Sequence, residues 1–179
     1  MLQVEDTVLV LVDVQEKLWA AVHDKVALAE NTVRMVRGAK ILDIPVLWTE
    51  QNPKGLGPTL AQVAELLGDS EPVTKLSFSC CGENRFVKRL EQLNRKQVLI
   101  GGMESHVCVY QTVADLVRSG YEVQVVADLV SSRTPENRII GLERCKCVGA
   151  SVTSTETALF ELLKAAEGEK FKLMLKVVK

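Results

Sequence analysis

Three reactive side chains stand far apart in the 179-residue chain, and each follows a short apolar segment. Asp13 comes directly after residues 7–12, and Lys75 after residues 71–74. Cys108 lies beyond a glycine-containing turn that follows the apolar run 97–100. If these segments are parallel strands, their carboxyl ends meet at the sheet edge where α/β proteins bind ligands. A carboxylate base, a cation and a nucleophile would then converge, as covalent catalysis by a thiol requires.

Cys108 has a sequence context that favours nucleophilic chemistry. It opens a segment, 108–118, whose apolar spacing predicts a helix. The positive end of a helix dipole stabilises a thiolate, so we expect this position to lower the thiol pKa. The remaining cysteines match neither a disulfide framework nor the spacing of a zinc site, and we interpret them as ordinary thiols. These are Cys80, Cys81, Cys145 and Cys147.

The approach of Lys75 to Asp13 poses a geometric difficulty. If one strand separates the two strands that carry them, their ends lie about 10 Å apart, at ~4.8 Å per strand. A long side chain or a folded-in loop must close that distance. The prediction of a shared site depends on this reach.

Apolar and amphipathic segments alternate along the chain. Strands are predicted at 7–12, 45–49, 71–74, 97–100, 121–127 and 150–153. Helices are predicted at 25–42, 60–67 after an N-cap at Thr59, 84–94, 108–118, 135–147 after an N-cap at Thr134, and 154–164. The last segment, 170–178, fits either a helix or an extended docking arm. The alternation predicts a three-layer α/β/α sandwich with a six-stranded parallel sheet, as one domain over residues 1–179.

The composition argues against several classes of partner. The formal net charge of −1 predicts no strong nucleic-acid or membrane field. No apolar run approaches the roughly 20 residues that span a bilayer. The first residues lack the basic and apolar regions of a signal peptide, so we expect a cytoplasmic protein.

The segments around the three reactive residues resemble a known family when taken together. They are Asp13-Val14-Gln15, residues 73–79 around Lys75, and residues 102–109 followed by Thr112. In this order and spacing they resemble the isochorismatase-like cysteine hydrolases, over nearly the whole chain. Residues 49–51, 55–59 and 131–133 resemble the isochorismatase-domain-containing branch of that superfamily.

The resemblance implies a catalytic triad of Asp13, Lys75 and Cys108. Cys108 would attack a carbonyl carbon, and Asp13 would take its proton and later return one to the leaving group. Lys75 would stabilise the thiolate and orient the carboxylate. The resemblance also implies a cis peptide between Met103 and Glu104, with the backbone N–H groups of Glu104 and Cys108 directed at the oxyanion.

Departures from other members of the superfamily narrow the chemistry. Nicotinamidases carry an Asp-x-His motif and further histidines that bind a metal, whereas residues 49–53 contain no histidine. We therefore expect no metal and no cofactor. Members that cleave the vinyl ether of isochorismate lack the cysteine, so Cys108 favours acyl chemistry on a small amide, ureido or imide-like substrate. The rival hypothesis is a binding or scaffold protein that keeps the fold and triad with little turnover. RNA cleavage has little support in the sequence.

Several residues near the predicted strand ends are candidates for substrate contacts. Trp19 fits a core or subunit contact equally well, Glu50 and Gln51 fit a solvated loop, and Phe78 fits the core. His106 is two helical positions from Cys108, so its side chain diverges and is better placed to line the pocket or cap the turn than to act as the base. The candidates are Gln15, Trp19, Glu50, Gln51, Phe78 and His106.

Two further features have competing interpretations. Arg133 fits either binding of a substrate carboxylate or a structural salt bridge. The apolar segment 173–178 predicts packing on the domain or on a neighbouring subunit. The family resemblance implies a homo-oligomer, which agrees with the second alternative.

Overall fold

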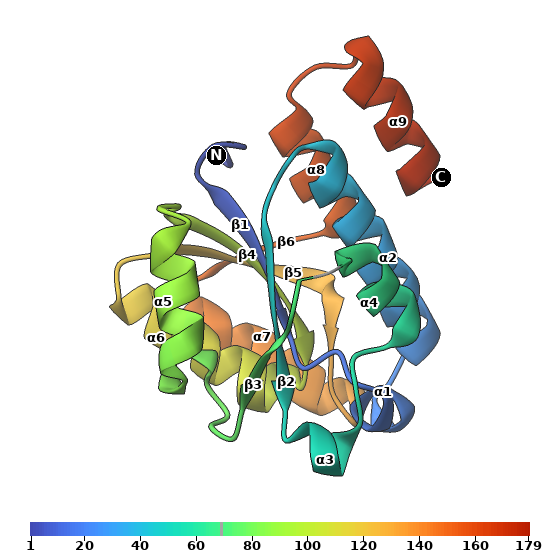
Figure 1. Cartoon of the computed structure of the whole chain (residues 1–179). Coiled ribbons are helices and arrows are strands. Elements are labelled where there is room, and N and C mark those ends of the chain that lie inside the picture. Colours follow the sequence, from blue (N-terminus) through green and yellow to red (C-terminus); the bar gives the residue numbers. More distant parts are fainter. Residues whose placement is uncertain (69) are drawn as a thin grey trace.

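The computed structural model describes residues 1–68 and 70–179, and within them six strands form one parallel sheet (Figure 1). Their order across the sheet is β3-β2-β1-β4-β5-β6. The strands are β1 (Thr7–Val12), β2 (Val46–Gln51), β3 (Val73–Lys75), β4 (Gln97–Met103), β5 (Glu122–Ser131) and β6 (Ser151–Thr153). The predicted six-stranded parallel sheet is confirmed.

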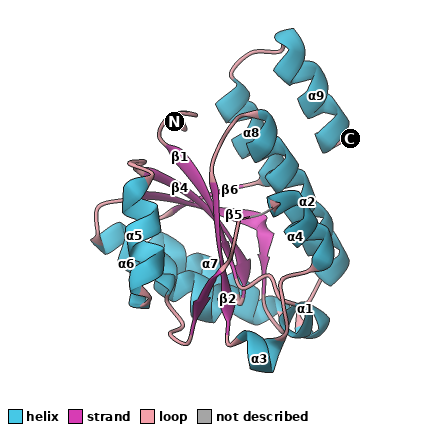
Figure 2. Cartoon of the chain, in the orientation of Figure 1, coloured by secondary structure: helices cyan, strands magenta, loops and turns pink. Residues whose placement is uncertain are grey.

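Helices cover both faces of this sheet (Figure 2), so the predicted three-layer sandwich is also confirmed. On one face lie α2 (Lys25–Ile41), α4 (Ala61–Leu67), α8 (Thr155–Leu163) and α9 (Gly168–Val178). On the other lie α5 (Asn84–Gln92), α6 (Tyr110–Arg118) and α7 (Pro135–Cys147). Short segments complete the chain: α1 (Glu16–Ala21), α3 (Pro53–Leu56) and the turns η1 (Cys80–Gly82) and η2 (Ser105–Val109).

The central strand β1 explains why the sheet is covered on both sides. All its residues are buried, and successive side chains alternate between the faces. Leu9 and Leu11 pack in the cluster beneath α2 and α8, whereas Val8, Val10 and Val12 pack in the cluster beneath α5 and α6. A strand that is apolar on both faces is stable only between two helical layers.

The strand order reverses between β1 and β4. The chain adds β2 and β3 on one side of β1, then returns to β4 and adds β5 and β6 on the other side. The carboxyl ends of β1 and β4 therefore open the crevice in which doubly wound sheets bind ligands. Gly102 allows these ends to approach, because a Cβ there would lie 2.0 Å from the carbonyl oxygen of Val12.

Some boundaries differ from those predicted. The glycines Gly101 and Gly102 do not end the strand at Ile100, because β4 continues through them to Met103. The helical backbone then begins at Ser105, earlier than predicted, as a π-helical turn in which the Val109 amide donates to the Glu104 carbonyl. Strand β5 likewise extends to Ser131, beyond the predicted end at residue 127.

The N-cap predicted at Thr59 is wrong. The cap position of α4 is Leu60, and no side chain caps that helix. The Thr59 hydroxyl and amide instead both donate to Glu50, because that carboxylate is nearly buried and needs donors.

The last segment resolves as the helix α9, which packs beside α2 and α8 (Figure 1). Its Met174 is fully buried in the cluster on that face. The segment thus packs on its own domain, one of the two alternatives predicted for it. Among the described residues, no helix is long and apolar enough to cross a membrane.

Candidate active site

Asp13 is the first residue after β1, and its carboxylate is completely buried. One oxygen, Oδ1, accepts a hydrogen bond of 2.7 Å from the hydroxyl of Thr49 in β2. The other, Oδ2, accepts one of 2.7 Å from the Lys75 ammonium. Burial raises the pKa of Asp13, and the charge and hydrogen bond of Lys75, with smaller contributions from Thr49 and Cys108, oppose that rise. A carboxyl held in this balance is suited to exchange a proton.

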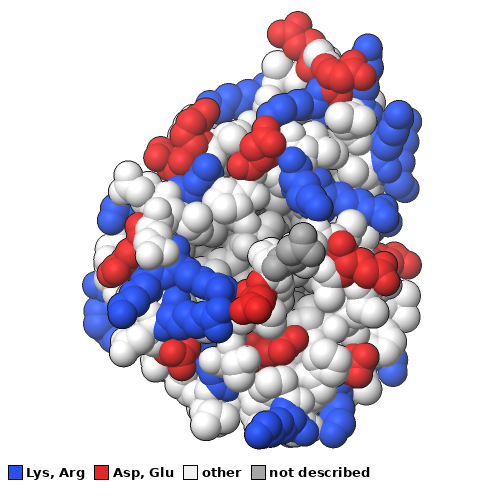
Figure 3. Space-filling view, in the orientation of Figure 1, with Lys and Arg blue, Asp and Glu red and all other residues white. Residues whose placement is uncertain are grey.

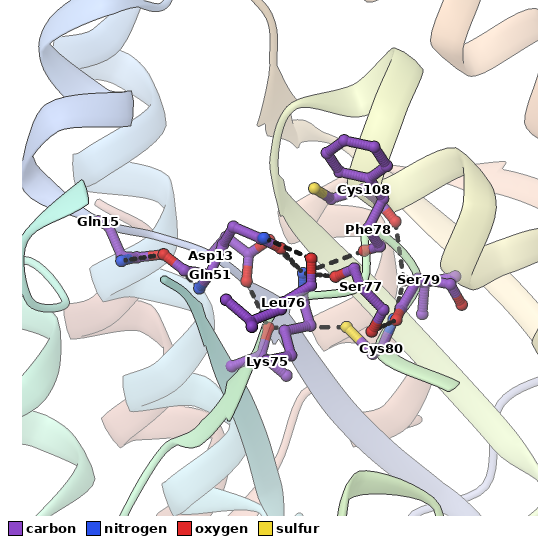
Figure 4. A network of polar contacts seen from close by, with 12 residues as sticks. Asp13, Gln15, Gln51, Lys75, Leu76, Ser77, Phe78, Ser79, Cys80 and Cys108 are labelled. Carbon is purple, nitrogen blue, oxygen red and sulfur yellow. Dashed lines mark hydrogen bonds and ion pairs between the residues drawn. The ribbon is translucent and has the colours of Figure 1, made fainter. Parts of the chain in front are cut away.

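Lys75 ends β3, two strands away from Asp13, and its side chain spans the intervening β2. Its ammonium group contacts Gln51 Oε1 at 2.8 Å and the backbone carbonyls of Ser77 and Phe78 at 3.1 and 3.0 Å (Figure 4). The side chain is 0 % exposed, like that of Asp13. The long side chain and the loop that folds in after it therefore close the gap that the sequence analysis identified.

Cys108 approaches this buried ion pair from the turn η2, which follows β4. Its thiol lies close enough to Asp13 for each group to alter the pKa of the other, and the residue is 6 % exposed. The Met103–Glu104 peptide before the turn is cis, and it is the bond that the family resemblance singles out. The structure thus brings Asp13, Lys75 and Cys108 together at the β1–β4 crevice.

The expected lowering of the thiol pKa by a helix N-terminus is wrong. Burial raises the pKa of Cys108 to about 12, the charge of Asp13 adds to the rise, and Lys75 opposes it. Moreover, Cys108 is the fourth residue of its helical segment and not part of a first turn that begins there. Desolvation outweighs the dipole at a buried position. The thiol is therefore protonated at rest, and its activation needs a proton acceptor.

The loop after β5 holds the turn η2 in place. Arg133 pairs with Glu104 at 2.8 Å, which favours the salt-bridge alternative for this arginine. The buried Ser132 hydroxyl lies 2.6 Å from that of Ser105 and 2.9 Å from His106 Nδ1. These contacts fix the direction in which η2 presents Cys108.

Gln15, Glu50 and Gln51 have their side-chain polar atoms bound to the protein itself. Gln15 is buried and bonds the backbone of Gln51 in both directions, at 2.7 and 3.1 Å. Glu50 accepts from Thr59, and Gln51 accepts from Lys75 while its Nε2 donates to the Leu76 carbonyl. Of the three, Gln51 holds Lys75 and the residue that follows it. Contacts of these side chains with a substrate stay a prediction.

The other three candidates for substrate contacts differ in their surroundings. Phe78 is 55 % exposed, so it is not core, and its carbonyl accepts from Lys75 beside the ion pair. His106 is directed to Ser132, in agreement with a role in holding the turn. Trp19 donates to the Lys25 carbonyl at 2.7 Å and lines a hollow beside α4. Phe78 is thus the aromatic residue best placed to meet a substrate.

The sequence analysis missed three residues that connect the parts of the site. Thr49 holds Asp13, and the fully buried Cys80 lies 3.6 Å from the Thr49 hydroxyl. Thr112 accepts from the Cys80 amide at 2.9 Å and donates to the Cys108 carbonyl at 2.7 Å. Thr49 and Thr112 stand within the motifs of the family resemblance, but only the pairing of β1 with β2 and the turn η1 reveal their partners.

In the described part of the chain, the side chains that could bind a metal ion are not grouped into a site. No group of three or more His, Cys, Asp or Glu side chains is placed there to hold a metal ion. Lys75 supplies a positive charge beside Asp13.

Comparisons with known proteins agree with this architecture. The family model described as isochorismatase domain matches residues 7–157. Isochorismatase domain-containing protein 2 of Danio rerio is 36% identical over 178 residues, which cover 99% of this chain and 89% of that protein.

Two solved structures superimpose closely. The structure described as MAR1 ribonuclease from Caenorhabditis elegans has a TM-score of 0.92 at 32% identity, covering 99% of this chain and 91% of that chain. The YcaC gene product of Escherichia coli, described as an octameric hydrolase of unknown specificity, has a TM-score of 0.93 at 22% identity, covering 98% and 88%. At that lower identity the second comparison supports the fold alone.

Proposed function

Because the chain belongs to the isochorismatase family, we propose that it is a cysteine hydrolase that cleaves a C–N bond of a small amide or ureido compound. One observation carries the proposal. The Cys108 thiol meets a buried carboxylate, Asp13, whose second oxygen is held by the Lys75 ammonium. A protonated thiol next to a carboxyl of raised pKa is arranged for proton transfer.

In the proposed reaction, the Cys108 Sγ attacks the carbonyl carbon of the substrate as Asp13 accepts the thiol proton. The oxyanion is stabilised by the backbone N–H groups of Glu104 and Cys108. The tetrahedral intermediate then expels the amine, which receives its proton from Asp13, and leaves a thioester on Cys108. Water hydrolyses the thioester with Asp13 as base, which releases the acid and restores the thiol. One water is consumed for each C–N bond broken.

Lys75 acts in this scheme without exchanging a proton. Its ammonium faces Asp13 and three further acceptors, which hold it in one orientation. It lowers the energy of the charged states of both Asp13 and Cys108. Gln51 and the carbonyls of Ser77 and Phe78 keep it there.

The proposal is tested by ammonia release from a panel of small amides and ureido acids. The wild type should release ammonia from at least one compound and carry a thioester adduct on Cys108 after an acid quench. Cys108→Ala should lose both signals, and Cys147→Ala should keep them, because Cys147 is an exposed thiol at the end of α7. Turnover that survives in Cys108→Ala would contradict the mechanism.

The alternative function is a binding or scaffold protein with little turnover. It is favoured if no compound in the panel gives either ammonia or an adduct. RNA belongs in the same panel, since the Caenorhabditis elegans neighbour is described as a ribonuclease. We expect no cleavage of RNA. On the face shown in Figure 3 basic and acidic side chains alternate, and Arg85 and Arg89 of α5 both bond Glu71.

Two further expectations accompany the proposed function. A homo-oligomer is in keeping with the octamer described for the Escherichia coli protein and with Ile139 and Ile140, which are exposed on α7. A cytoplasmic location stays a prediction from the sequence.

A further inference from the structure

Thr49 occupies a special position between two parts of the site. It lies in β2, the strand that separates Asp13 from Lys75, and it is fully buried. Its hydroxyl donates to Asp13 Oδ1 at 2.7 Å, while Lys75 donates to Oδ2. Both oxygens of the carboxylate therefore have fixed donors, one charged and one neutral. The neutral donor has no part in the proposed chemistry.

Cys80 is a second neighbour of the Thr49 hydroxyl. Its Sγ lies 3.6 Å from the Thr49 hydroxyl oxygen, and the residue has no exposed surface. Its backbone is fixed by the bond from its amide to the Thr112 hydroxyl. Cys80 is thus a second, buried thiol close to the ion pair, and the proposed mechanism does not use it.

The number of hydrogens sets the direction of these bonds. A threonine hydroxyl has a single hydrogen, and in Thr49 it is directed to Asp13 Oδ1. The contact between Thr49 and Cys80 must then use the S–H group as donor and the hydroxyl oxygen as acceptor. Burial, reinforced by the charge of Asp13, raises the pKa of Cys80 to about 12, so the thiol keeps the proton that it donates.

We propose that Thr49 is a positioning residue for the hydrolysis, oriented by the Cys80 thiol so that its hydroxyl holds the Asp13 carboxylate charged and directed at Cys108. The inference rests on the proposed function. It gives the two buried thiols different roles: Cys108 transfers its proton to Asp13, and Cys80 retains its proton as a fixed donor.

The consequence is a pH dependence set by Asp13. The titratable groups that face this carboxyl are Lys75 from β3, Cys108 from η2 and Cys80 from η1. The hydrogen bond from Thr49 lowers the pKa of Asp13 against the effect of burial. Its loss must raise that pKa further, so that the carboxylate becomes protonated, and unable to accept the thiol proton, at a higher pH than in the wild type.

The test measures the second-order rate constant of Cys108 with iodoacetamide from pH 5 to 9. Peptide mapping identifies the alkylated thiol, and a Cys147→Ser background removes the exposed cysteine. In the wild type the rate constant should fall at acid pH as Asp13 becomes protonated, and we call this part of the profile the acid limb. We expect Thr49→Val, which keeps the shape of the side chain but loses the hydroxyl, to shift the acid limb to higher pH. At a pH on that limb, alkylation should be about tenfold slower, the order of one hydrogen bond to a charged group. Thr49→Ser should keep the wild-type profile.

A second pair of variants tests the role of Cys80. Cys80→Ala leaves Thr49 without its donor and should shift the limb in the same direction by a smaller amount, about threefold in rate. Cys80→Ser supplies a new donor and should restore the profile. Thr32→Val is the matched control, because Thr32 is a buried threonine in α2 whose hydroxyl donates to the Leu28 carbonyl at 2.7 Å.

The outcomes separate this inference from the proposed function. If iodoacetamide does not select Cys108 in the wild type, the proposed function fails. If it selects Cys108 but folded Thr49→Val has the wild-type profile, only the positioning role is overturned. Should Thr49→Val not fold, identical profiles for Cys80→Ala and Cys80→Ser would overturn it instead.

Discussion

Cys108 and Cys145 lie in the same apolar cluster, on one face of the sheet. Their surroundings differ in the charged groups that act on the thiol. Burial raises the pKa of both thiols to about 12. At Cys145, in α7, burial is the cause of the whole rise. At Cys108, the charges of Asp13 and Lys75 act in addition, in opposite directions.

This difference distinguishes the proposed nucleophile from a cysteine of the core. A raised pKa alone does not identify a site, since both thiols have it. A neighbouring proton acceptor does, because it offers the thiol a route to the thiolate that does not pass through bulk water. The Cys108 neighbourhood has Asp13 in that role. The structure gives Cys145 no charged neighbour that alters its pKa.

The largest expected effect comes from removing the cation from the Cys108 neighbourhood. Lys75→Met leaves the buried Asp13 without its partner, and breaking such a pair costs about 3–5 kcal/mol of unfolding free energy. Urea unfolding at neutral pH measures this loss. Lys88→Met on the exposed surface of α5 is the matched control and should change stability little.

The loss in Lys75→Met should also depend on pH. The folded-state pKa of Asp13 already lies above its ordinary value of 3.8, and without Lys75 it rises further. A group with a raised folded-state pKa contributes stability at acid pH that is lost as the pH rises through that pKa. Unfolding at pH 4 should therefore show a smaller loss than at pH 7. An equal loss at both pH values would contradict the account of this carboxyl.

A much smaller effect is expected at Cys145. Cys145→Ala removes a sulfur from the core and should cost about 1 kcal/mol, the order of a small buried deletion. Both pH 6 and pH 8 lie below the ordinary thiol pKa of 9.0, so the thiol is neutral in the folded and unfolded states and the cost in urea unfolding should be the same at both. A cost that changes between these values would show an acidic or basic neighbour and would remove the contrast with Cys108.

The sequence was sufficient for much of the fold because the central strands are apolar on both faces. Residues 7–12 are predicted and found as β1 with the same limits. Boundaries fail where a tertiary contact overrides the local pattern. Gly101 and Gly102 suggest the end of a strand, but the sheet extends through them, and the Leu129 side chain and the Val12 backbone leave no space for a Cβ at these positions. The helix α1 buries none of its residues, so its sequence has no apolar periodicity from which a helix could be predicted.

The candidate site also has a part that the sequence predicts and a part that only the packed structure reveals. Asp13, Lys75 and Cys108 follow strands, and their convergence follows from a parallel sheet. The reach of Lys75 across β2 could not be predicted, because it depends on how the loop after β3 folds. The pKa of Cys108 was predicted in the wrong direction, since burial and the charge of Asp13 are properties of the packed site. The contacts of Thr49 and Cys80 likewise require knowledge of which strands are neighbours.

The central claim is that Asp13 accepts the proton of Cys108, and Asp13→Asn tests it most directly. The measurement is the rate constant of Cys108 with iodoacetamide at pH 6, in the Cys147→Ser background, for folded Asp13→Asn and wild type. Loss of the charge removes one cause that raises the thiol pKa, but burial, the larger cause, remains and the proton acceptor is gone. The account predicts alkylation about a hundredfold slower, the lower range of general-base catalysis. An equal or faster rate in Asp13→Asn would contradict it.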